Sequence, residues 1–188
     1  MRQATGDKKL TPCTLAACCL LLIACIGCGQ STTVSSDWKR LEPSIAAEDF
    51  ILPQLDGPRV SLSGYRGRVV IMEFWATWCG PCRFSLPSLE VIYKRYRDRG
   101  VTVLLINQGE EADIIRPWAG RRFTAPILLD REQQVGRLYA VQGIPRLFIV
   151  DQNGQVIYAH EGYGGGLEHN LALILDELLS RGTPPKDA

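Results

Sequence analysis

The chain has 188 residues, of which 46% are hydrophobic and 22% charged, enough for one globular domain with extra sequence at its ends and too few for two full cores. The formal net charge is +1. Removal of residues 1–24 would take away three of the 21 basic and one of the 20 acidic residues, leaving 18 against 19. Without an excess of basic residues, we expect no nucleic-acid partner.

Residues 1–24 have the features of an export signal. A basic start precedes roughly 15 mostly apolar residues, too few to span a bilayer comfortably. The apolar run ends in "LIAC", which resembles the bacterial lipobox, where a peptidase cuts before a lipid-modified cysteine. We therefore predict a lipoprotein signal peptide over residues 1–24 and lipidation at Cys25. A cut before Cys28, an uncleaved anchor and a plain secretory signal are alternatives, and each places the domain outside the cytoplasm.

The remaining chain divides into three parts. Residues 25–45 are polar at first and lack a sustained period, so we expect a flexible tether. About 20 flexible residues have an r.m.s. span of roughly 25 Å, enough to lift a domain clear of a membrane. We expect the folded domain over residues 46–181 and a C-terminal tail over residues 182–188.

The pattern within the domain alternates strands and helices. The apolar run of residues 69–75 predicts a strand covered on both faces, and Pro87 predicts a kink in the helix after it. Strands are expected at residues 50–52, 59–61, 69–75, 101–107, 127–129, 146–150 and 156–160, and helices at 81–97, 111–123, 133–139 and 167–179. This order, with hairpins near both ends, predicts an α/β sandwich of mixed strand direction.

A single cysteine pair lies in the predicted domain. Of seven cysteines, only Cys79 and Cys82 fall there, spaced C-x-x-C. A bridge across so short a loop constrains the unfolded chain little, which favours reactivity over stapling. Structural zinc would need two more ligands, and His160 and His169 are not in a metal-like spacing. We therefore expect no metal.

The position of this pair, between a strand and a helix, favours thiol chemistry. Unpaired N–H groups and the helix dipole at a helix start stabilise a thiolate. Such surroundings lower a cysteine pKa from about 8.5 to roughly 3.5–7.5. Cys79 is therefore the expected attacking thiolate, and Cys82 the residue that resolves the mixed disulfide.

The stretch "EFWATWCGPC" is similar to the active site of thioredoxins, matching at Trp78, Gly80, Pro81 and both cysteines. The lipobox, the early hairpin and the helix over residues 111–123 resemble the membrane-tethered TlpA/ResA branch. The resemblance implies a thioredoxin-like α/β/α sandwich with a mixed central sheet, an N-terminal β-hairpin extension and an inserted helix.

A second stretch, "VQGIPRLFIVDQNGQV", is similar to the cis-proline loop of thioredoxins. It implies a cis bond at Pro145 next to the active site, with a groove beside Ile144 where a partner's backbone can pair. Two positions depart from the family pattern. Arg146 replaces the usual threonine after the proline, and Ser85 replaces a glutamate found in ResA-like members three residues after the second cysteine.

Glu73 is the one acid in the apolar run before the cysteines. Thioredoxins carry a buried aspartate at this position, and strand alternation places Glu73 on one face with Ile71 and Trp75. A buried, unpaired carboxyl has a raised pKa and suits a general base, here for the proton of Cys82. The alternatives are an ion pair with a basic residue, or contact with solvent at the sheet end.

The resemblance implies an extracytoplasmic, lipid-anchored thiol:disulfide oxidoreductase of the bacterial cell envelope, facing the periplasm in a bacterium with two membranes. Its redox disulfide joins Cys79 and Cys82, and no cofactor is required. The implied partners are protein disulfide or thiol substrates, including those of cytochrome c maturation, and a membrane thiol-electron donor. A peroxiredoxin is disfavoured because its proline-led motif is absent, and a copper-handling lipoprotein because its relatives use C-x-x-x-C with a histidine.

Overall fold

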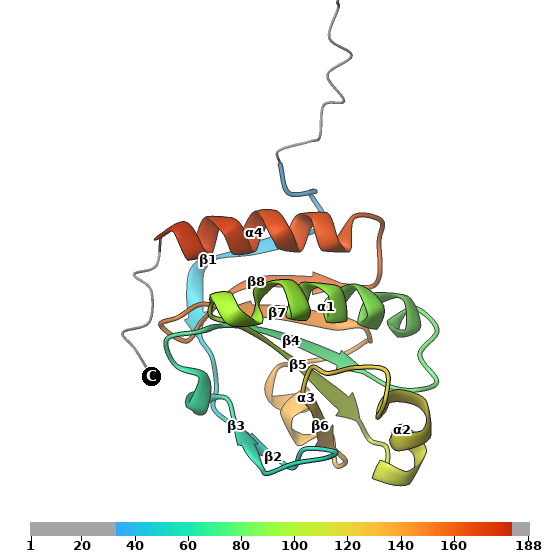
Figure 1. Cartoon of the computed structure of the whole chain (residues 1–188). Coiled ribbons are helices and arrows are strands. Elements are labelled where there is room, and N and C mark those ends of the chain that lie inside the picture. The colour runs from blue at the N-terminus through green and yellow to red at the C-terminus, as the bar shows by residue number, and fades with distance from the viewer. Residues whose placement is uncertain (1–32, 182–188) are drawn as a thin grey trace, which may run out of the picture. The chain divides into compact units, whose positions relative to one another are not determined.

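The computed structural model describes residues 33–181, which build a central six-stranded sheet in the order β1-β8-β7-β4-β5-β6 (Figure 1). Strands β4, β5 and β6 run parallel, whereas β7 pairs antiparallel with β4, β8 with β7, and β1 with β8. The strands are β1 Lys39–Ala46, β4 Val69–Trp75, β5 Val101–Gln108, β6 Ile127–Asp130, β7 Arg146–Val150 and β8 Gln155–Glu161. The mixed sheet and thioredoxin-like architecture are as predicted.

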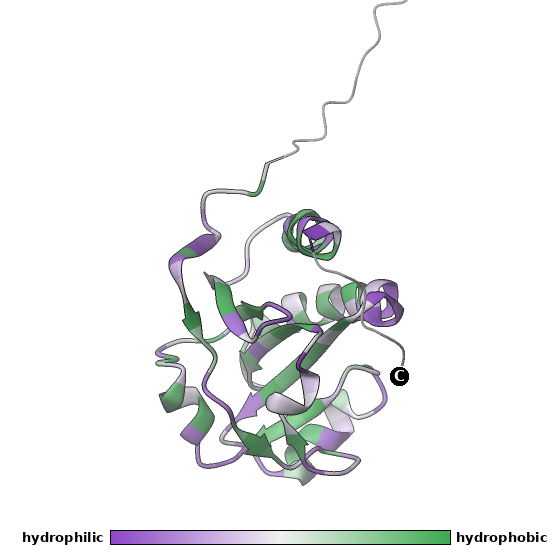
Figure 2. Ribbon diagram, turned by 90° about the vertical axis from the view of Figure 1, so that its left-hand side faces the viewer, coloured by the Kyte–Doolittle hydropathy of each residue, from purple (hydrophilic) through white to green (hydrophobic). Residues whose placement is uncertain are grey.

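Helices cover both faces of this sheet. One face is covered by α1, α2 and α4, whose buried side chains share a cluster with the strands. The other is covered by α3 and by the small hairpin of β2 and β3. The bounds are α1 Cys82–Tyr96, α2 Ala112–Ala119, α3 Gln134–Leu138, α4 Leu167–Arg181, β2 Ile51–Leu52 and β3 Val60–Ser61. In Figure 2 the central strands are mostly hydrophobic, and hydrophilic residues gather on helices and loops. Among the described residues, no helix is long and apolar enough to cross a membrane.

Strand β4 is buried along its whole length, as its apolar run predicts. Its alternate residues divide between the two clusters. Ile71 and Trp75 pack beneath α1, whereas Met72 and Phe74 face the opposite side. Because side chains alternate, Glu73 points to the same side as the cysteines.

The hairpin of β7 and β8 turns at Gly154, as the Asn-Gly signal predicts. Gly154 has φ of +78°, a conformation that favours glycine. A Cβ there would also collide with the guanidinium of Arg66, which donates to the Asn153 carbonyl at 2.7 Å. The turn therefore requires glycine for two reasons.

The expected tether is wrong over residues 39–45, because they form most of edge strand β1. The sequence of this segment shows no strand-like alternation, because its pairing with β8 shifts register between Arg40 and Ile45 and most of its side chains are exposed. Just before it, Trp38 is buried and stacks on the His160 ring, with centroids 4.6 Å apart. His160, next to the end of β8, is thus covered by the indole ring.

Three further predictions fall wholly or partly on residues that the structure does not describe. They are the signal peptide over residues 1–24 with lipidation at Cys25, the first part of the tether, and the tail over residues 182–188. The inserted helix does lie within the described part. It is shorter than expected, because α2 ends at Ala119 and Gly120 forms its C-cap.

Candidate active site

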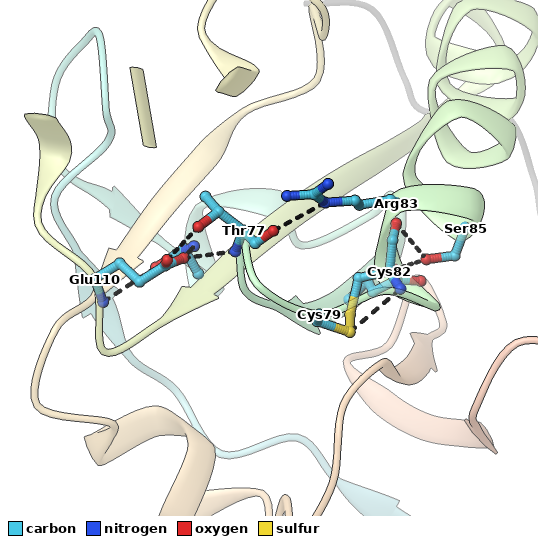
Figure 3. The surroundings of a disulfide bond; sticks show 8 residues. Thr77, Cys79, Cys82, Arg83, Ser85 and Glu110 are labelled. Carbon is cyan, nitrogen blue, oxygen red and sulfur yellow. Dashed lines mark hydrogen bonds between the residues drawn. A yellow bond between two sulfur atoms is a disulfide. The ribbon is translucent and has the colours of Figure 1, made fainter. Parts of the chain in front are cut away.

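The two cysteines form a disulfide between the end of β4 and the start of α1 (Figure 3). Their Cα atoms are 5.3 Å apart, and the Cys82 N–H donates to Cys79 Sγ at 3.2 Å. This amide belongs to the first residue of α1, so a helix N-terminus faces the sulfur of Cys79. Cys79 keeps 3% exposure whereas Cys82 has none. An incoming thiol can therefore reach only Cys79.

The residues around the pair shape the rim of the site. Pro81 is the N-cap of α1, where it lacks only an N–H that the helix would not use. Space around the Cα of Gly80 is open. Trp78 is 70% exposed, so its indole stands on the rim of the site.

The loop before β7 lies at the same edge of the sheet. The Ile144–Pro145 bond is cis, as the resemblance implies. Arg146 pairs with Phe74 in the β4–β7 ladder, so the proline stands level with the end of β4, from which the cysteine loop departs. Arg146, which stands where the family usually has threonine, forms a salt bridge of 2.9 Å with Glu161. Its positive charge is therefore paired within the protein.

Glu73 is buried beneath α1, with 1% exposure. Its Oε1 contacts the hydroxyl of Ser85, which also lies 3.1 Å from the backbone oxygen of Cys82. No basic side chain within residues 33–181 forms a salt bridge with Glu73. Burial raises the pKa of the carboxyl to about 8, against a smaller lowering by the Ser85 hydrogen bond. Both alternatives, the ion pair and the solvent contact, are thus absent here.

A second carboxylate holds the loop that carries the cysteines. The side chain of Glu110 accepts hydrogen bonds from the Thr77 N–H at 2.7 Å, from the Thr77 hydroxyl and from the Asn107 amide at 2.6 Å (Figure 3). The Glu110 N–H in turn donates to Asn107 Oδ1 at 3.3 Å. Thr77 stands two residues before Cys79, so this clamp fixes the start of the active-site loop.

Comparison with known proteins gives the family. The model of the Redoxin family matches residues 42–172. The chain belongs to the redoxin family.

Similar proteins include several named for thiol and disulfide chemistry. The chain is 37% identical over 138 residues to the thiol-disulfide oxidoreductase ResA of Geobacillus kaustophilus, covering 73% of this chain and 79% of that one. A Chlorobium tepidum protein assigned as the thiol:disulfide interchange protein DsbE superposes with a TM-score of 0.66 at 34% identity, covering 72% of this chain and 96% of that one. The exposed lipoprotein thioredoxin of Streptococcus pneumoniae gives a TM-score of 0.62 at 31% identity, covering 70% and 100%. This redoxin is a thiol:disulfide oxidoreductase.

The Glu110 clamp was missed by the sequence analysis, although a signal for it exists. Parallel strands β4 and β5 pair Trp75 with Asn107, so the residues following both strands meet at one sheet edge. Polar residues at the end of β5 and just after it, in "NQGE", were therefore candidates for the redoxin site. Within residues 33–181, no three His, Cys, Asp or Glu side chains gather as metal ligands.

Proposed function

We propose that this redoxin reduces disulfides in partner proteins outside the cytoplasm. The observation that carries the proposal is the hydrogen bond from the first amide of α1 to Cys79 Sγ. In the reduced protein this amide and the helix dipole favour the thiolate form of Cys79, the form that attacks a disulfide. The slight exposure of Cys79 and the complete burial of Cys82 support the same order of roles.

The proposed cycle moves two electrons from the protein to its partner. The Cys79 thiolate attacks one sulfur of the partner disulfide, forming a mixed disulfide and releasing the other sulfur as a thiolate. Cys82 then loses its proton to Glu73 and attacks Cys79 Sγ. This step closes the Cys79–Cys82 disulfide and releases the second partner thiolate. A membrane thiol donor afterwards reduces the disulfide and restarts the cycle.

The reducing direction rests on resemblance to reducing thioredoxins at Gly80, Pro81 and Ile144. Reduction potentials of C-x-x-C proteins run from about −270 mV for thioredoxin to about −120 mV for an oxidant such as DsbA. Equilibration with glutathione of known poise measures the potential. A value close to −120 mV would reverse the proposed direction.

The proposed location is the bacterial cell envelope, with a lipid on Cys25 as the anchor and substrates that include the haem-attachment cysteines of c-type cytochromes. The support is the lipobox-like "LIAC" together with the ResA and lipoprotein relatives. Mass spectrometry of the membrane-extracted protein identifies the N-terminal residue and any lipid. A deletion strain with normal amounts of holocytochrome c would remove that substrate from the proposal.

The decisive experiment is trapping with Cys82→Ala, which leaves Cys79 able to attack but prevents resolution. The variant should accumulate mixed disulfides through Cys79, and mass spectrometry should identify the partners. The matched control is Cys79→Ala, which should trap none. If no partner is trapped and the wild-type protein fails to reduce insulin, the proposed reductase function is wrong.

A further inference from the structure

A groove rich in arginine borders the active-site loop. Its volume is about 230 Å³, and its walls come from α1, α2 and the segment after α2: Arg83, Pro87, Glu90, Trp118, Arg122 and Phe123. A larger hollow of about 730 Å³ lies beside it, sharing Trp118 and Arg122 and adding Arg116 and Arg121. Basic side chains thus follow one continuous surface.

Trp118 organises the charged groups of this surface. The ring packs against Trp75 of β4, with centroids 5.5 Å apart, so its position is fixed by the core. The guanidinium carbons of Arg83 and Arg122 lie 5.7 and 5.4 Å from its centroid. Guanidinium groups stacked on an aromatic ring keep their N–H edges available for carboxylates.

Three of the four arginines lack an acidic partner. Within residues 33–181, no carboxylate forms a salt bridge with Arg83, Arg121 or Arg122. Arg83 is bound only to a neutral group, since its Nε donates to the Thr77 carbonyl at 3.1 Å. Their charges are therefore not neutralised by the protein itself.

Two of the three acids that line the same surface are already paired. Asp56 bonds to Arg116 at 3.1 Å. The Glu90 carboxylate accepts from Thr124 and the Ala125 N–H and pairs with Lys94 at 3.1 Å. Asp113 also lines the larger hollow but forms no salt bridge within the described chain. The net charge of the residues that line the groove and the adjoining hollow is therefore positive.

The groove begins where the partner disulfide must approach. Arg83 follows Cys82 in α1, and in Figure 3 its side chain extends back to Thr77, at the start of the loop that carries Cys79. A polypeptide segment joined to a sulfur at Cys79 can therefore extend over Arg83 towards Arg121 and Arg122. We propose that this groove binds an acidic segment flanking the disulfide of the partner protein, and so selects among substrates. The inference rests on the proposed reductase function and deepens it.

The test uses three peptide disulfides with the same cysteine-containing core, flanked by glutamates, glutamines or lysines. For the wild-type protein, kcat/KM for the glutamate peptide should exceed that for the glutamine peptide by on the order of tenfold, with the lysine peptide slower still. Because exposed charges are screened, salt near 1 M should abolish the preference. Arg121→Glu with Arg122→Glu should reverse the order, so that the lysine peptide is reduced faster than the glutamate peptide.

The matched control places the same charge change at the C-terminal end of α1 and just after it, as Arg95→Glu with Arg97→Glu. This control should keep the wild-type preference. Equal loss of preference in both double variants would assign the effect to overall charge and overturn the proposed binding of an acidic segment in the groove. A wild-type protein that reduces all three peptides at the same rate would overturn it as well. Failure to reduce even the glutamine peptide would instead count against the reductase function. The glutamine peptide also reports whether each variant is folded.

Discussion

Ser85, in the first turn of α1, joins the buried carboxyl of Glu73 to the backbone oxygen of Cys82. A hydroxyl can donate one hydrogen bond and can also accept hydrogen bonds. When Glu73 is ionised, Ser85 donates to it. When Glu73 is protonated, the carboxyl can donate to Ser85, and the hydroxyl can turn to the Cys82 carbonyl. The protonation state of Glu73 is thus coupled to the backbone that carries the resolving cysteine.

Glu73→Gln should slow resolution of the mixed disulfide at least tenfold while leaving the first attack by Cys79 nearly unchanged. The amide fills the same space but cannot accept a proton, and general bases contribute typically 10²–10⁴-fold. Stopped-flow measurement with a fluorescent peptide disulfide separates the two steps. Equal resolution rates in the two proteins would remove Glu73 from the proton transfer.

Ser85→Ala should move the pH dependence of resolution upward. Its hydroxyl lowers the pKa of Glu73 in opposition to burial, so its loss leaves the carboxyl protonated to a higher pH. The rate of resolution measured between pH 6 and about 10 gives the shift. A profile that stays in place would show that Ser85 does not tune this carboxyl.

Stability should also depend on pH through Glu73. The pKa is about 8 in the folded protein against 4.5 for a free side chain. As the pH rises through this window, the unfolded chain ionises while the folded one stays protonated, so the free energy of unfolding falls. The loss approaches about 5 kcal/mol by pH 8 as an order of magnitude. Urea unfolding of the oxidised protein at pH 5 and 8 should show the decrease in wild type and a smaller one in Glu73→Gln. Parallel decreases would contradict the assignment.

Glu110→Ala should loosen the active-site loop. The Thr77 N–H and the Asn107 amide would lose their acceptor, at a cost of about 1–3 kcal/mol in the free energy of unfolding. Misplacement of Cys79 should lower the rate of first attack by roughly tenfold to a hundredfold. Glu110→Gln keeps an acceptor oxygen and can donate to the Thr77 hydroxyl. This variant should retain most of the stability and most of the rate of first attack. If Gln is as damaging as Ala, the charge of Glu110 matters rather than its hydrogen bonds.

Trp38→Ala should destabilise the domain by about 3 kcal/mol or more, as expected for a buried tryptophan. This result would show that folded structure begins before residue 46. Ile45 is 60% exposed in the neighbouring strand, so Ile45→Ala should change the free energy of unfolding by less than about 0.5 kcal/mol. Chemical denaturation of both variants provides the comparison. A Trp38→Ala variant as stable as wild type would contradict the prediction that residue 38 belongs to the folded core.

Local patterns predicted most of the fold and the redox pair. The continuous burial of β4 follows from its apolar run, and the position of Cys79 before α1 follows from strand-to-helix order. Strand β1 could not be found this way, because its exposed side chains carry no alternation and its pairing depends on β8, over a hundred residues later. The Glu73–Ser85 contact was missed for a related reason. From the sequence, Ser85 is notable only because it replaces the glutamate found in ResA-like proteins. The packing of α1 on β4 makes it the hydrogen-bond partner of Glu73.

Within residues 33–181, strand β1 is an edge of the sheet with no further strand beside it. The strand carries features that oppose further strand addition: Lys39, Arg40 and Glu42 are exposed charges, and Pro43 offers no backbone N–H. The four-residue strand β6 at the opposite border is short. Both features disfavour the joining of two copies sheet to sheet, which is a common route to aggregation.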